Sequence, residues 1–102
     1  MFDVFAIYAP PEDASAFDVR YRTVHVPLSR AMPGLAEFSW GYGDIPEAHV
    51  VARMTFADEA HADVAFASAE GSAAAADLVN FAGAGVQLVR VTREVLAPAP
   101  QA

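Results

Sequence analysis

Imidazole groups are the side chains of this chain best suited to chemistry. The sequence holds three histidines, His25, His49 and His61, and no cysteine. Cysteine nucleophiles, Cys-ligated zinc and iron–sulfur clusters are therefore excluded, which leaves oxygen and imidazole chemistry. No two histidines have the spacing that holds a metal from one helix or strand, and no phosphate loop or dinucleotide fingerprint is present. We therefore expect no metal and no cofactor.

His25 has the most suggestive surroundings of the three. It lies beside an apolar stripe of helical spacing, formed by Phe17, Tyr21, Val24 and Leu28. This position places it on the border of the core. Pro27 follows two residues later and is expected to break the helix, because proline lacks an N–H and disfavours helical angles at Val26. An imidazole of tunable pKa at such a point suits proton transfer. Its ring could equally cap a carbonyl freed at the break and do no chemistry.

The other two histidines are expected to have ordinary surface roles. His61 lies in an acidic helical stretch, where solvent exposure explains it. His49 opens a strand and is expected at the rim of the sheet. It shares a face with Glu37, Ser39, Arg53 and Thr55, whereas Phe38, Trp40 and Tyr42 alternate onto the other face. We expect this aromatic set to lie under the helices.

The order of elements predicts the fold class. Strands are expected at 2–8, 35–42, 49–56 and 86–95, and helical segments at 13–32, 58–67 and 68–81. The middle two strands form a hairpin. The order strand, helix, strand, strand, helix, strand predicts an α+β, ferredoxin-like βαββαβ fold with a four-stranded antiparallel sheet. We expect one domain over residues 1–96 and a flexible tail over 97–102.

Both faces of the predicted sheet carry apolar side chains. Phe5 and Ile7 alternate with Val4 and Tyr8 in the first strand, and Val89 and Val91 do the same in the last. Helices can cover only one face of a sheet of this kind. We expect a second copy of the chain to cover the other face, giving a homodimer.

Charge and hydropathy exclude several partners. The formal net charge is -7, which repels phosphate backbones and anionic lipid headgroups. We expect no nucleic-acid partner and no membrane association. The N-terminus lacks the features of a secretion signal, so a cytoplasmic location is expected. All six basic residues are arginine, a bias typical of a GC-rich bacterial genome.

The segment around His25 resembles a family signature. Residues 17–28, FDVRYRTVHVPL, are similar to the F-x-x-x-Y-R-x-x-H-x-P-L pattern of EthD-like proteins. Further matches are the strand ending in Tyr8, the turn at 32–35, and the segments 68–71 and 76–81. The resemblance implies a dimeric α+β barrel, in which two ferredoxin-like sheets pair and each subunit has a pocket between helices and sheet.

The resemblance also implies a role for His25. The family histidine matches His25, and its flanking tyrosine matches Tyr21. The family is named after a gene cluster for degrading a fuel ether, in which a cytochrome P450 does the oxidation. Other relatives look like cofactor-free decarboxylases, cyclases or oxygenases of aromatic polyketides. These relatives suggest an enzyme acting on a small apolar or aromatic metabolite, with His25 as general acid or base.

The pocket residues follow from this hypothesis. Tyr21 and Trp40 would orient the substrate, and Phe38, Phe66 and Phe81 would supply an apolar wall. The same pocket would serve an alternative function equally well. In that alternative the protein is a non-catalytic ligand-binding protein, or an accessory to an oxidoreductase system.

Overall fold

A computed structural model describes residues 1–96, so the predicted tail at 97–102 lies outside the described residues. In chain order the elements are β1 (Phe2–Tyr8), α1 (Ala14–Arg20), the π-helical η1 (Tyr21–His25), α2 (Val26–Arg30), β2 (Glu37–Tyr42), β3 (Val50–Phe56), α3 (Glu59–Ala67), α4 (Ala69–Asp77), the 3₁₀ turn η2 (Leu78–Asn80) and β4 (Val86–Thr92). The sheet has four strands in the order β2-β3-β1-β4. All three pairings are antiparallel. The predicted ferredoxin-like fold is confirmed.

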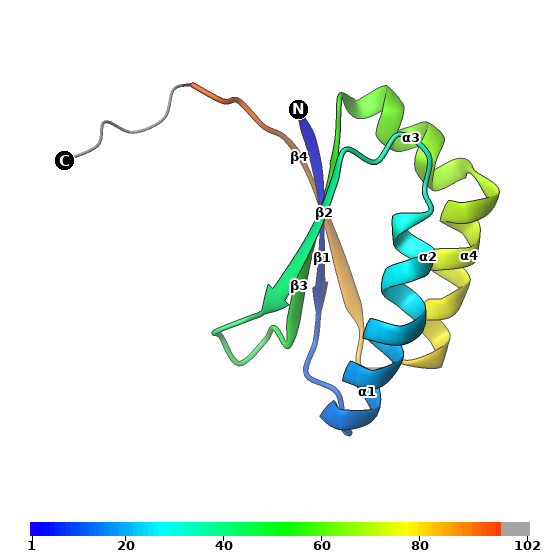
Figure 1. Cartoon of the computed structure of the whole chain (residues 1–102). Helices are drawn as coiled ribbons and strands as arrows, with labels where there is room; N and C mark the ends of the chain where they lie inside the picture. Colours follow the sequence, from blue (N-terminus) through cyan, green and yellow to red (C-terminus); the bar gives the residue numbers. More distant parts are fainter. Residues whose placement is uncertain (97–102) are drawn as a thin grey trace.

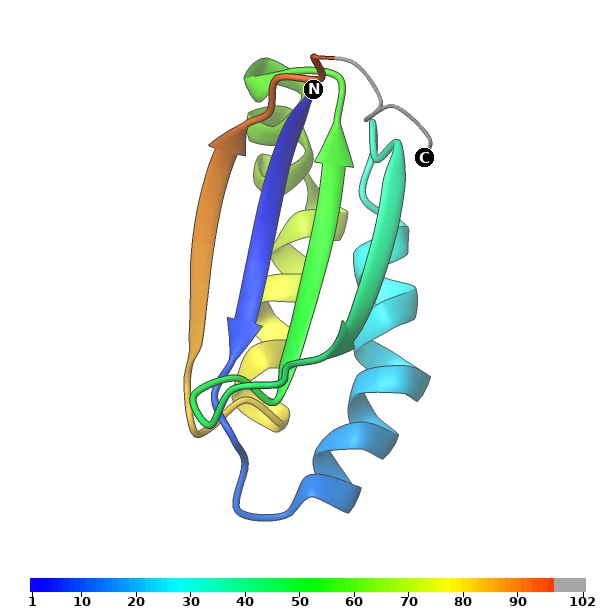
Figure 2. The same cartoon turned by 90° about the vertical axis from the view of Figure 1, so that its left-hand side faces the viewer.

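The helices cover one face of the sheet and leave the other open (Figures 1 and 2). On the covered face Val4 lies opposite Met54, and Tyr8 lies opposite Val50. These side chains are buried, and they form the core together with Phe17 and Tyr21 of the first helix. The alternate residues of each strand point to the open face. Apolar positions fall on both faces, as the alternation predicts.

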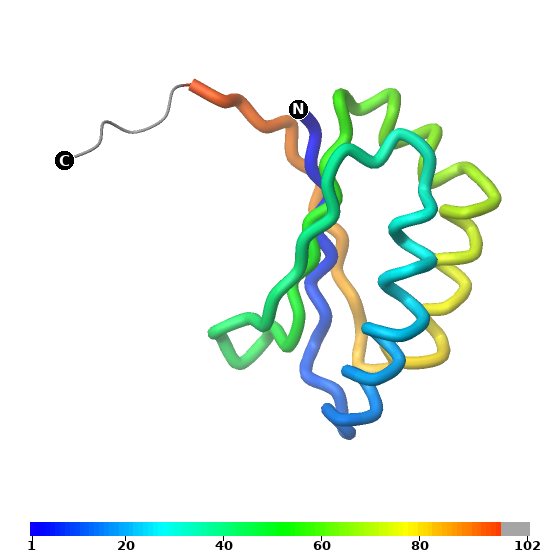
Figure 3. Tube along the Cα trace, in the orientation of Figure 1, coloured from blue at the N-terminus to red at the C-terminus, as the bar shows by residue number. Residues whose placement is uncertain are grey.

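The first helix does not break at Pro27, which corrects the sequence-based expectation. α1, η1 and α2 follow one another without a gap from residue 14 to 30, as the continuous coil of the Cα trace shows (Figure 3). The Val26 N–H donates to the Tyr21 carbonyl five residues back, and Val26 keeps helical angles (φ -59, ψ -49). The π turn ends at His25, and a new α segment begins at Val26. Pro27 therefore lies in the first turn of α2, where a missing N–H is tolerated. π turns of this kind are frequent at functional sites.

Two side-chain caps begin the later helices. The Asp58 carboxylate accepts the His61 N–H at the start of α3, and the Ser68 hydroxyl accepts the Gly71 N–H at the start of α4. Asp and Ser are among the residue types preferred at this position. Within residues 1–96, no helix is long and apolar enough to cross a membrane.

Gly71 lies where the start of α4 meets the end of α3, and we expect Gly71→Ala to destabilise the fold. A Cβ at this position would lie 2.3 Å from the Ala65 carbonyl oxygen and 2.7 Å from that of Phe66. Backbone atoms cannot move aside cheaply, so a loss of roughly 1–3 kcal/mol in the free energy of unfolding is expected. Urea denaturation measures it. Gly83→Ala is the control, because nothing lies within 4 Å of its added Cβ. Equal stability of the two variants would contradict the packing described.

Candidate functional site

His25 lies inside the protein, with its ring between two other polar side chains. It is 4% exposed and ends the π turn η1. The Nδ1 atom is 3.2 Å from Oδ2 of Asp77, and Nε2 is 3.2 Å from the Tyr8 hydroxyl. The alternative contact with a helix-end carbonyl is not formed, because the helix continues and both ring nitrogens bind side chains. His25 is therefore buried and is not on the border of the core.

Asp77 anchors His25 from the last residue of α4. Its carboxylate is 4% exposed and also accepts hydrogen bonds from Arg20 and from the Asn80 amide, the latter at 3.0 Å. Burial raises the pKa of Asp77, but the hydrogen bonds and the positive charge of Arg20 outweigh it, so the pKa lies below its ordinary value. Asp77 is thus an ionised carboxylate whose charge is compensated by Arg20.

These contacts define where the protons lie. An ionised carboxylate can only accept, so Nδ1 of His25 carries a hydrogen and donates it to Asp77. Burial lowers the pKa of His25, and Arg20 adds to this, although Asp77 acts in the opposite direction. The ring is therefore neutral at pH 7, and its Nε2 accepts the Tyr8 O–H. Burial also raises the pKa of Tyr8, with help from the Asp77 charge, so Tyr8 stays protonated.

A cavity of about 90 Å³ lies beside the hydrogen-bonded side chains of Tyr8 and His25, between the sheet and the helices. Its wall includes His25, Tyr8 and Tyr21, and the rest is nearly all apolar. The Tyr21 hydroxyl is buried and has no hydrogen-bond partner among the residues that the structure describes. Burial raises the pKa of Tyr21, so this hydroxyl keeps its proton. The arrangement presents one neutral base and one unpaired phenol to an apolar space.

The predicted site residues are distributed around this cavity in two layers. His25, Tyr21, Phe38 and Phe66 line it. Trp40 lies one layer further out, with its ring centroid 5.0 Å from that of Tyr21.

Phe81 likewise lies against His25, at 4.7 Å between ring centroids, and is not part of the lining. Sequence reasoning missed Tyr8, Asp77 and Arg20 as site residues. Their only signal is that all three fall in the segments that resemble the EthD family.

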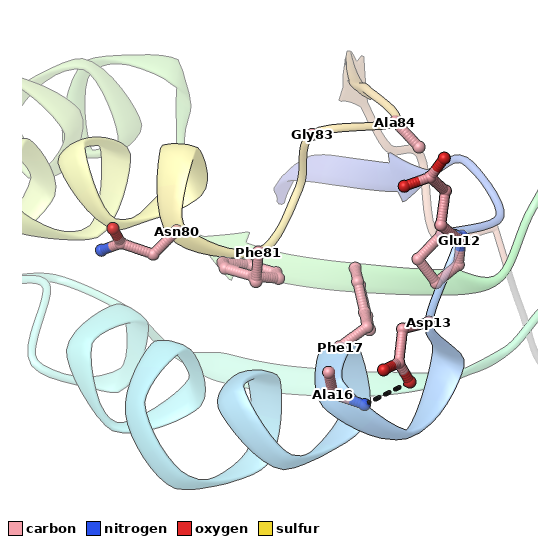
Figure 4. Close-up of a pocket in the computed structure, with 9 residues that line it drawn as sticks. Glu12, Asp13, Ala16, Phe17, Asn80, Phe81, Gly83 and Ala84 are labelled. Carbon is pink, nitrogen blue, oxygen red and sulfur yellow. Dashed lines mark hydrogen bonds between the residues drawn. The ribbon is translucent and has the colours of Figure 1, made fainter.

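Phe81 also borders an open groove of about 550 Å³ on the outer surface (Figure 4). Phe17 stands beside it, at 5.1 Å between ring centroids, and Figure 4 shows both rings between α1 and the turn at 83–84. Glu12 and Asp13 lie at the groove's rim, where Asp13 accepts the Ala16 N–H. A single layer of aromatic rings therefore separates this groove from His25.

His49 does not share a face with Arg53 and Thr55, which corrects a second expectation. Its Nε2 lies 2.8 Å from Asp18 of α1, and its ring packs edge-on against Phe17. The reason is that His49 precedes β3, so strand alternation does not govern its side chain. Tyr42 donates to the same Asp18 at 3.0 Å and is 52% exposed, so the end of the aromatic set extends beyond the helices.

No group of three or more His, Asp or Glu side chains within residues 1–96 is arranged to hold a metal. Fold and site together define a small ferredoxin-like protein with an imidazole-bearing cavity under its helices. The chain belongs to the EthD family, because residues 9–85 match the EthD domain model.

Two similar proteins agree with this membership, and a third shares the fold. An uncharacterized 11.0 kDa protein in the thcB-thcC intergenic region of Rhodococcus erythropolis is 39% identical, over 96% of this chain and 100% of its own. The crystal structure of an ethyl tert-butyl ether D (EthD) family protein from Bacillus halodurans is 29% identical, with a TM-score of 0.84, and the match covers 92% of this chain and 99% of that one. A dimeric ferredoxin-like protein of unknown function from Jannaschia is 20% identical over 91% of this chain and 100% of its own, with a TM-score of 0.67.

Proposed function

We propose that this protein binds a small apolar or aromatic molecule in the cavity beside His25 and moves a proton on it without a cofactor. Decarboxylation, cyclisation and oxygenation are the reaction classes that such a step would serve. The observation that carries the proposal is the Tyr8–His25–Asp77 chain at the wall of an apolar cavity. A proton passes from the ligand to Nε2 of His25 in one of two ways. It is relayed through the Tyr8 hydroxyl, or it moves directly after the ligand has displaced that hydroxyl from Nε2.

The electrostatics of the site favour His25 as a base. The neutral ring has a lone pair at Nε2, and proton uptake would create an imidazolium beside the Asp77 carboxylate. A carboxylate in this position orients the ring and stabilises the charge that forms. Burial lowers the pKa of His25 toward a value that keeps the base free at neutral pH.

Hydrogen–deuterium exchange tests the proposal directly. The protein is incubated in D₂O with small ketones and phenols, and loss of the proton next to the carbonyl or hydroxyl-bearing carbon is followed by NMR. Catalysed exchange is expected if His25 transfers a proton. Saturable binding without exchange would instead support the alternative, a non-catalytic ligand-binding protein or an accessory to an oxidoreductase system. Absence of both binding and exchange would contradict the proposal.

We also propose that two copies pair through the open face of the sheet. This face carries Phe5, Ile7, Val51, Val89 and Val91, and none of the described helices covers it (Figure 2). The Arg53 Nε is buried there without a hydrogen-bond partner in the described part of the chain, so an acceptor from a second copy would satisfy it. The charged groups of this face are paired, Arg53 with Glu37 and Arg93 with Asp3. An apolar surface bordered by paired polar groups is typical of a protein–protein interface.

Sedimentation measures this pairing. Val89→Glu places a charge on the open face, midway along the edge strand β4 and opposite Phe5, and we expect it to convert a dimer into a monomer. Val79→Glu is the control, because Val79 lies on the helix side and is 86% exposed. A monomeric wild-type protein at micromolar concentration would refute the pairing.

A further inference from the structure

We infer that the cavity beside His25 takes the carbonyl end of a small neutral ketone or aldehyde, with the Tyr21 O–H as its hydrogen-bond donor. This inference rests on the proposed function, which supplies a ligand for the cavity but leaves its chemistry open. Three features of the cavity support it: an unpaired donor, the absence of charge in its wall, and its size.

The unpaired donor is the Tyr21 hydroxyl. Tyr21 is 1% exposed and lines the cavity, yet its hydroxyl has no hydrogen-bond partner among residues 1–96. A buried polar group without a partner is costly, and few native proteins leave one without a reason. The neighbouring Tyr8 hydroxyl is already committed to His25. A ligand oxygen that accepts from Tyr21 would remove the deficit.

Charge decides which oxygen this can be. None of the described cavity-lining residues is charged, and the Asp77 carboxylate that binds His25 is already paired with Arg20. A carboxylate or phosphate in the cavity would be buried without a positive partner, which is strongly unfavourable. An uncharged carbonyl oxygen accepts a hydrogen bond at a much smaller desolvation cost. Its α-proton is also a group that a neutral imidazole can remove.

Size decides how much of the ligand lies inside. The cavity of about 90 Å³ is smaller than the roughly 150 Å³ of a cavity that encloses benzene. A phenyl ring therefore cannot be enclosed together with its substituent. Leu88 and Ala75, both in the cavity wall, are exposed, so the cavity reaches the surface between α4 and β4. The carbonyl end fits inside, and a larger apolar group extends through this opening.

Three probes of one shape test the inference at pH 7. Acetophenone carries the carbonyl, α-methylstyrene replaces its oxygen with a CH₂ group, and benzoate carries a charge in the same place. Binding is measured by chemical-shift titration of the ¹⁵N-labelled protein. We expect acetophenone to bind about tenfold more tightly than α-methylstyrene, a ratio typical of one buried hydrogen bond, and benzoate to bind least.

Variants identify the donor. Tyr21→Phe is expected to weaken acetophenone binding about tenfold and to leave α-methylstyrene binding unchanged. Its melting temperature should not fall, because the lost hydroxyl has no hydrogen-bond partner among residues 1–96. Tyr42→Phe is the matched control, since its hydroxyl bonds to Asp18 and Arg22 outside the cavity.

The outcomes distinguish failure of the carbonyl assignment from failure of the proposed function. Equal affinity for acetophenone and α-methylstyrene, or equal weakening of both by Tyr21→Phe, would overturn the carbonyl assignment and leave a ligand cavity in place. Preferred binding of benzoate would do the same. If neither neutral probe binds in the cavity, the proposed function fails, and this inference fails with it.

Discussion

Substitution of His25 by glutamine is expected to slow catalysed proton exchange by about 10²–10⁴-fold, the usual contribution of a well-placed general base. Glutamine fills a similar volume and can still bond to Tyr8 and Asp77, so the fold should survive. It cannot take up a proton near neutral pH. The rate is measured with the most reactive compound found in the D₂O experiment.

Two controls test whether the loss of exchange is specific to the His25 imidazole. His49→Gln removes an imidazole that bonds to Asp18 on the surface, and its exchange rate should equal that of the wild type. The wild-type rate should also fall when the pH drops through the pKa of His25, which lies below 6.5, because only the neutral ring accepts a proton. Undiminished exchange in His25→Gln would remove His25 from the mechanism.

Asp77→Asn is the second substitution with a large expected effect, a loss of about 2–4 kcal/mol in the free energy of unfolding. The carboxylate is buried and accepts hydrogen bonds from Arg20, Asn80 and His25 at once. The amide keeps a single acceptor and no charge, which leaves Arg20 without its counterion. Arg20 is 39% exposed, so water offsets part of the loss. Chemical denaturation measures the difference.

The pH dependence identifies the charge as the cause. Because the folded-state pKa of Asp77 lies below its ordinary 3.8, its stabilising effect is fully present well above that value. It is lost as the pH falls through the folded-state pKa. The gap between wild type and Asp77→Asn should therefore be complete at pH 7 and narrow below about pH 4. Asp63→Asn, an exposed carboxylate paired with Arg90, should cost less than 1 kcal/mol. An equal gap at pH 7 and pH 3 would contradict this account.

The fold is readable from the sequence because each signal is local. Alternating strands, Asp58 and Ser68 as caps, and the helical stripe each involve a few neighbouring residues, and their order implies the topology. The π turn was not predicted, because proline ordinarily ends a helix. The wider hydrogen-bond spacing of a π turn is also not associated with particular residue types.

The site was only partly predictable for a related reason. Residue type, spacing and family resemblance single out His25 and Tyr21 in one helix. Asp77 and Tyr8 contact His25 although they lie 52 and 17 residues from it in the sequence. An aspartate at the end of a helix looks like a surface residue until the fold brings it against a histidine.

The one-sided coverage of the sheet has a consequence for how ligands saturate a pair of subunits. If two copies pair through the open face as proposed, the two cavities of the pair face away from each other. Two complete sheets would then separate them, with a spacing of about 10 Å between their backbones. No wall residue would be shared, so we expect each subunit to bind ligand independently and a titration to give a simple hyperbola.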